Sequence, residues 1–116
     1  MIVDFNGMEE TRLAQFKGGA GETIAKMRVD EFGKIMYGRL EPGSSIGFHP
    51  HETNSEIIYI LSGTADFLYD EGREKASAGE CHYCPRGHSH SMINNGSKDL
   101  VFFAVVPEHN VPDAQA

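Results

Sequence analysis

The chain has 116 residues, of which 40% are hydrophobic and 23% are charged. This length and composition fit one globular domain and exclude a chain that is disordered throughout. The formal net charge of −7 disfavours nucleic acid and an anionic membrane surface as partners, because both are negatively charged. The sequence has no apolar stretch of membrane-spanning length, no secretory signal pattern at its N-terminus and only two cysteines, so we expect a cytoplasmic protein.

The predicted elements are short β-strands separated by turns. Residues 1–22 form a lead-in, in which the glycine-rich stretch 17–22 is flexible by composition. From residue 23 onward, runs rich in β-branched and aromatic residues alternate with Gly, Pro, Asn and Asp. These runs predict strands at 23–29, 34–40, 45–51, 56–61, 65–69, 73–77, 81–84, 90–93 and 100–106.

The fold class follows from this succession of strands. No window of the sequence has a sustained 3.6-residue periodicity, so no helix is predicted. Many short strands in one small domain are typical of a β-sandwich or a β-barrel, and we assign residues 23–107 to it. The polar segment 108–116, which contains a proline, is expected to be a loose C-terminal tail.

Two of the predicted strands are apolar on both faces. Residues 57–61 read Ile-Ile-Tyr-Ile-Leu, and residues 101–106 read Val-Phe-Phe-Ala-Val-Val. A strand with one solvated face alternates between apolar and polar residues, so we expect both faces of these strands to be covered. One face fills the interior of the domain. The other is covered by a second subunit in a homodimer, which we prefer, or by the first 30 residues of the same chain.

Three histidines and a glutamate form a candidate metal site. His49 and His51 are two positions apart on a predicted strand, so their side chains point to the same face. Glu56 begins the next strand, and His90 comes from a strand far along the chain. Imidazole and carboxylate suit one divalent transition metal (Mn, Fe, Co, Ni, Cu or Zn), and such a ligand set leaves positions open for water or substrate. The alternative is a group of surface histidines near a turn.

The same four residues belong to two motifs that resemble those of the cupin family. In the first motif Gly is followed by His-x-His, Glu and Gly, and in the second Gly is followed by Pro-x-Gly, His and Asn. The matching residues are Gly43, His49, His51, Glu56, Gly63, Gly79, Pro85, Gly87, His90 and Asn94. The resemblance implies an all-β fold, a double-stranded β-helix (jelly-roll) barrel that is usually dimeric. It also implies a metal held by His49, His51, Glu56 and His90.

Strand parity predicts the surroundings of this site. If Glu56 points inward, Ile58 does so too, and Met92 accompanies His90 in the same way. Ile58 and Met92 then form an apolar wall for a bound substrate, while packing in the core is the other interpretation. Gly47 lies on the same face as the first pair of imidazoles and leaves space beside the metal.

The remaining candidate groups indicate structural roles. Cys81 and Cys84 are three positions apart on a predicted strand, so they face opposite sides and do not chelate one ion. The orientation of His82 cannot be read across the turn that follows it. His88 is expected at the mouth of the barrel, and His109 in solvent.

These features favour two kinds of function. The first is a small metalloenzyme of dioxygenase, decarboxylase or isomerase type, in which the metal acts on a small oxygen-bearing organic molecule. The second is a metal-dependent protein that binds a sugar or a small acid without turnover. Fold alone does not decide between them, because cupins support many chemistries.

Overall fold

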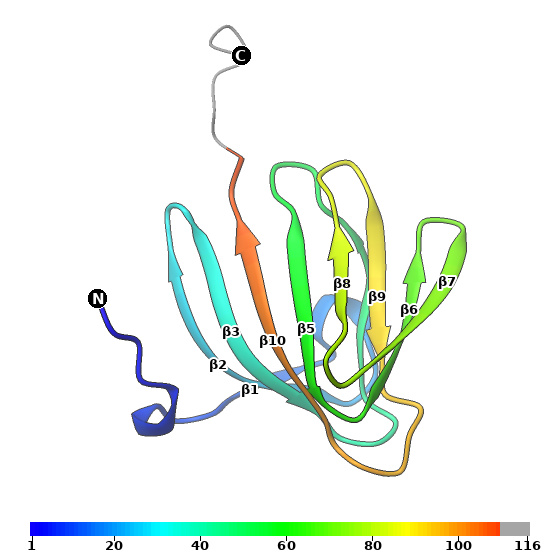
Figure 1. Ribbon diagram of the computed structural model, residues 1–116, viewed down its shortest axis with the longest axis horizontal. Helices are drawn as coiled ribbons and strands as arrows, with labels where there is room; N and C mark the ends of the chain where they lie inside the picture. The colour runs from blue at the N-terminus through cyan, green and yellow to red at the C-terminus, as the bar shows by residue number, and fades with distance from the viewer. Residues whose placement is uncertain (110–116) are drawn as a thin grey trace, which may run out of the picture.

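A computed structural model describes residues 1–109 and has the predicted all-β architecture (Figure 1). Each predicted strand is found, with ends that differ by at most one residue from the expected ones. The elements are η1 (Phe5–Gly7), β1 (Thr11–Ala14), η2 (Phe16–Gly18), β2 (Glu22–Asp30), β3 (Gly33–Leu40), β4 (Ser45–Pro50), β5 (Glu56–Ser62), β6 (Thr64–Tyr69), β7 (Gly72–Ser77), β8 (Cys81–Cys84), β9 (Ser89–Ile93) and β10 (Leu100–Pro107). No helical segment in this described part is long and apolar enough to cross a membrane.

The strands of residues 1–109 form two antiparallel sheets. One has six strands in the order β1-β2-β3-β10-β5-β8, and the other has four in the order β4-β9-β6-β7. Figure 1 shows β3, β10, β5 and β8 following one another across the molecule, with β9, β6 and β7 beyond them. Neighbours that are distant in sequence, such as β3 with β10 and β4 with β9, give the jelly-roll topology.

The hydrophobic core draws on both sheets. Met36, Ile58 and Phe102 come from the larger sheet, while Phe67 and Met92 come from the smaller one, and each is buried. These side chains occupy alternate positions of their strands, as expected where one face of a sheet is turned to the core. The sheets are therefore joined by a shared apolar interior.

The outer face of β5 is exposed in the single chain. Ile57, Tyr59 and Leu61 keep 38%, 44% and 41% of their surface accessible, so the expectation that the chain covers both faces of this strand is not met here. On β10 the N-terminal segment provides part of the cover, because Phe5 of η1 lies edge-on to Phe103 with 5.9 Å between ring centroids. A second subunit remains a prediction for the rest of this face.

The lead-in is more structured than its glycine content indicates. β1 pairs with β2, and η2 packs against β4. Gly47 makes this approach possible, since a Cβ at that position would lie 2.8 Å from the carbonyl carbon of Gly18 and closer still to the carbonyl oxygen of Lys17. Gly47 therefore makes room for η2 and not, as the sequence suggested, for the metal.

Of the predicted tail, residues 108–116, the structure describes only Glu108 and His109. Residues 110–116 lie outside the described residues. Glu108 and His109 continue beyond β10, and Glu108 forms an isolated β-bridge with Asn54. The backbone N–H of His109 donates to the carbonyl of Thr53 at 2.8 Å. These contacts connect the end of β10 to the loop between β4 and β5.

Candidate metal centre

The structure brings the four candidate ligands together at one end of the barrel. His49 is on β4 and His90 is its direct partner on β9, while His51 follows β4 and Glu56 begins β5. The possible ligand atoms of these side chains all lie within 4.8 Å of one another. His51, Glu56 and His90 are buried, and His49 is partly buried. Strand parity correctly places His49 and His51 on one face, and the four residues converge as the resemblance to the cupin motifs implies.

Hydrogen bonds on the far side of two of the imidazoles set their tautomers. His49 Nδ1 lies 2.7 Å from the carbonyl oxygen of Gly47, and His51 Nδ1 lies 2.5 Å from Asn54 Oδ1. A carbonyl oxygen only accepts, so each Nδ1 donates and each Nε2 keeps its lone pair when the ring is neutral. The amide of Asn54 is held in this orientation because its Nδ2 donates to Glu108 Oε1 at 3.1 Å.

The Nε2 atoms face one another and a carboxylate. His51 Nε2 and His90 Nε2 are 3.0 Å apart, and they lie 3.3 Å and 2.9 Å from Glu56 Oε1. Lone pairs and a carboxylate oxygen this close repel one another in a buried site unless a cation, either a proton or a metal ion, lies among them. This donor set fits a divalent transition metal, which prefers imidazole and carboxylate.

The pKa values of the cluster agree with a site that attracts positive charge. Burial on its own raises the pKa of Glu56, but hydrogen bonds with His51 and His90 outweigh it and hold the pKa well below its usual value. Burial likewise opposes protonation of His51, yet its hydrogen bonds with Glu56 and Asn54 raise its pKa. Burial lowers the pKa of His49, which favours the neutral form that a metal requires.

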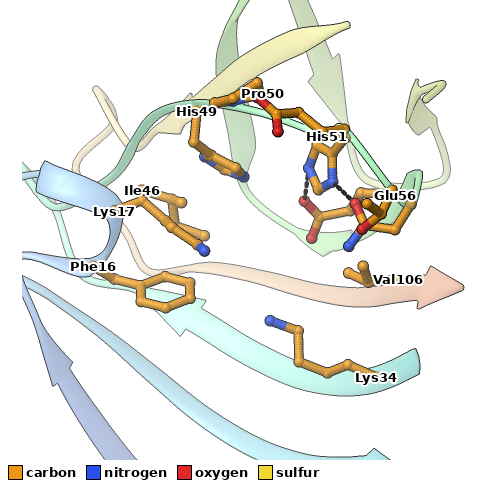
Figure 2. Close-up of a pocket in the computed structure, with 12 residues that line it drawn as sticks. Phe16, Lys17, Lys34, Ile46, His49, Pro50, His51, Glu56 and Val106 are labelled. Carbon is orange, nitrogen blue, oxygen red and sulfur yellow. Dashed lines mark hydrogen bonds and ion pairs between the residues drawn. The ribbon is translucent and has the colours of Figure 1, made fainter. Parts of the chain in front are cut away.

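A cavity of about 390 Å³ opens beside the cluster. Figure 2 shows the ammonium groups of Lys17 and Lys34 directed into the space between Phe16 and the imidazoles. The two Nζ atoms lie 5.5 Å and 5.4 Å from the centroid of the Phe16 ring. Burial lowers the pKa of Lys34. The cavity therefore joins an imidazole and carboxylate floor to a cationic wall.

The predicted wall residues lie elsewhere. Ile58 and Met92 are buried in the hydrophobic core and are not among the residues that line this cavity, so the structure places them as the packing interpretation expects. The apolar lining comes from Phe16, Ile46 and Val106. Phe16 and Lys17 were not anticipated from the sequence, because η2 reaches the site only through its packing on β4. Lys34, on β3, was not singled out from the sequence either.

The open questions about the remaining histidines and cysteines have structural answers. His82 is buried against the cluster, with Nε2 3.0 Å from His90 Nδ1. His88 pairs with Asp70 at the surface. Cys81 is exposed and Cys84 is buried, so the two thiols lie on opposite faces of β8, as predicted.

Comparison with known proteins agrees with this architecture. A family model described as a cupin domain matches residues 36–106. The chain is a member of the cupin family. Another cupin, the oxalate-binding protein of Thermotoga maritima, is 34% identical over 113 residues, which cover 91% of this chain and 93% of that protein. A germin-like protein of Morus alba is 30% identical over 101 residues, which cover 83% of this chain and 44% of that protein.

Solved structures show the same fold. A crystal structure from Thermotoga maritima, described as a predicted oxalate decarboxylase, matches with a TM-score of 0.87 and 32% identity, and the match covers 93% of this cupin and 99% of that chain. The protein KdgF from Halomonas sp. matches with a TM-score of 0.64 and 17% identity, over 81% of this cupin and 84% of that chain. At that low identity, the second match concerns the fold alone.

Proposed function

We propose that this cupin binds one divalent transition metal through His49, His51, Glu56 and His90 and holds a small carboxylate anion beside it. The observation that carries the proposal is the position of the cluster, because three of its members, His49, His51 and Glu56, line a cavity whose wall carries two ammonium groups. A divalent ion bound there supplies a Lewis-acidic centre that a carboxylate oxygen can reach.

The charges around the cavity favour an anionic ligand. Glu56 offsets only one of the two charges of a divalent ion, and Lys17 and Lys34 add positive charge on the opposite wall. Glu52 opposes them, but it is exposed at the edge of the cavity and is therefore screened by water. A cavity of about 390 Å³ fits a small molecule. The relative that is named an oxalate-binding protein supports a small dicarboxylate as the ligand.

Each group of the chain has a distinct part in this binding. Lys34 and Lys17 donate charge-assisted hydrogen bonds to the anion. Phe16 lies beneath both ammonium groups and limits access of water to that side of the cavity. The carbonyl of Gly47 and the amide of Asn54 keep two of the imidazoles turned toward the centre. The two ammonium groups thus orient the anion from one side of the cavity, and the metal bound by the cluster orients it from the other.

A metal-dependent enzyme of dioxygenase, decarboxylase or isomerase type is the second candidate. It is favoured by Lys34, because the lowered pKa of this ammonium makes its proton easier to release inside the cavity. A turnover assay on the metal-loaded protein, following oxygen uptake and CO₂ release with a panel of small carboxylic acids, separates an enzyme from a binding protein. Binding without product formation would exclude the enzyme and support the binding function.

Metal analysis tests the first half of the proposal. Untagged protein should carry about one transition-metal ion per chain. His51→Ala should lose that ion, because it removes a buried member of the cluster. His88→Ala is the matched control, since its ring pairs with Asp70 at the surface. Equal metal content in the two variants would contradict the ligand assignment.

Calorimetric titration with oxalate tests the second half. Lys34→Met should weaken oxalate binding to the metal-loaded protein by roughly 10- to 100-fold, the usual effect of losing a charge-assisted hydrogen bond. Lys75→Met is the control, because Lys75 is exposed and pairs with Asp66 away from the cavity. A ligand that binds equally to both variants would rule out the cationic wall as its site.

We also propose that a second copy of the chain covers the exposed face of the larger sheet. Tyr59 and Tyr83 are 44% and 54% exposed on this face, beside the apolar residues of β5, and contiguous apolar surface of this kind is typical of an interface. Light scattering should give the mass of a homodimer for the wild type and of a monomer for Tyr59→Glu. A monomeric wild type would refute the proposed homodimer.

The cytoplasmic location stays a prediction from the composition.

A further inference from the structure

A buried histidine outside the four-residue cluster links it to the surface. His82, on β8, has only 1% of its side chain exposed. Its ring stacks on Phe67 with 3.8 Å between centroids and an interplanar angle of 16°. Its Nε2 lies 3.0 Å from His90 Nδ1, and its Nδ1 lies 2.5 Å from Glu74 Oε1. Glu74, on β7, is 49% exposed. The three side chains thus form a hydrogen-bonded chain from the cluster to solvent.

The direction of each hydrogen bond in this chain follows from its outer end. A carboxylate has no hydrogen to donate, so His82 Nδ1 donates to Glu74. The ring of His82 is 1% exposed and stacks on Phe67, and a buried apolar contact of this kind suits an uncharged imidazole. A neutral ring that donates through Nδ1 accepts through Nε2, so His90 Nδ1 is the donor in the inner bond. His90 Nε2 then carries the lone pair that faces Glu56 and the other imidazoles.

Nothing else in the described residues around His90 sets its tautomer in this way. The rings of His49 and His51 are fixed by oxygen atoms, which always accept. The partner of His90 is an imidazole nitrogen, which donates in one tautomer and accepts in the other. Without Glu74, His82 is free to turn its proton toward His90, and His90 then presents an N–H to the cluster.

We infer that Glu74 and His82 are positioning residues, which fix the tautomer and the ring orientation of His90 for metal binding. This inference rests on the proposed metal site. Partners of metal ligands typically change metal affinity by 10- to 100-fold when they are removed. Glu74 and His82 act through His90 and do not themselves belong to the cluster.

Competition with a chelator tests the inference. Glu74→Leu should weaken binding of Co²⁺ or Zn²⁺ by about 10-fold, because it removes the acceptor that orients His82. Glu74→Gln should restore most of the affinity, because its amide oxygen still accepts the hydrogen bond. Glu71→Leu, an exposed change in the adjacent turn, should have no effect. His82→Phe keeps a ring against Phe67 and should weaken binding further.

Histidine ¹⁵N spectra of the zinc-loaded protein give a second measurement. The wild type should show the proton of His90 on Nδ1, and Glu74→Leu should broaden or redistribute this signal. A wild type that binds no metal overturns the proposed site and this inference with it. A wild type that binds metal, with unchanged affinity and tautomer in Glu74→Leu and His82→Phe, overturns this inference alone. Glu74 is on the surface, so the Glu74 variants should fold and still test the inference even if His82→Phe fails to fold.

Discussion

Replacing Gly47 with alanine should disturb the cavity while keeping all four candidate ligands and the backbone carbonyl that accepts from His49 Nδ1. The new Cβ would overlap the carbonyl oxygen of Lys17 and lie 2.8 Å from the carbonyl carbon of Gly18, so η2 must withdraw by about 1–1.5 Å to restore ordinary van der Waals separation. Overpacking of this kind costs about 1–3 kcal/mol. In a domain of this size, the melting temperature should fall by about 5–20 °C.

The same displacement should weaken carboxylate binding more than metal binding. Phe16 and Lys17 belong to η2 and move with it, whereas the cluster residues belong to β4, β5, β9 and the loop after β4. Differential scanning fluorimetry measures the stability, and calorimetry with oxalate and with metal measures the two affinities. Gly72→Ala is the control, because its Cβ would meet Tyr69 only at an ordinary 3.7 Å. Identical melting temperatures and oxalate affinities in the two variants would refute the reasoning.

Three further predictions follow from buried groups. Metal affinity should rise with pH and be lost below about pH 6, because protons compete for the imidazoles, above all for His51, whose pKa is raised by its hydrogen bonds. The depressed pKa of Glu56 keeps this carboxylate ionised over the same range, so metal content that stays constant down to pH 4 would contradict the prediction. Iodoacetamide at pH 8 should modify the exposed Cys81 and spare Cys84, whose pKa burial raises to about 12, as peptide mass spectrometry will show. Asn94→Ala should destabilise the fold by about 3 kcal/mol in urea unfolding, since it removes two donated hydrogen bonds and one accepted hydrogen bond of a buried amide; a loss below 1 kcal/mol would be inconsistent with that role.

One part of the cluster follows from a local rule, and the other part is what the resemblance of the two motifs to those of the cupin family implies. His49 and His51 share a face through strand parity, and the motif spacing brings Glu56 and His90 to them. The boundaries of the predicted strands could also be read from the sequence, because glycine and proline mark the turns. Local periodicity therefore predicts most of the strands, whereas the assembly of the cluster is predicted by the motif resemblance.

The wall of the site could not be predicted, because it depends on contacts between distant segments. Lys17 reaches the cavity only when η2 packs on β4, and the signal for that packing is the absence of a side chain at Gly47. His82 was undecided because the turn at 85–87 breaks the parity count. The residues of β5 are apolar on both faces whether a second subunit or the same chain covers them, so the pattern alone does not tell what lies outside.

The bridge between Glu108 and Asn54 makes the end of the last strand part of the support of His51. A chain cut after Pro107 keeps all four cluster residues and every strand of the barrel. It nevertheless releases the amide of Asn54, which can then rotate and offer its NH₂ group to His51 in place of its oxygen. Truncation or fusion at this point would therefore act on the metal centre from a distance, and expression designs should leave Glu108 and His109 intact.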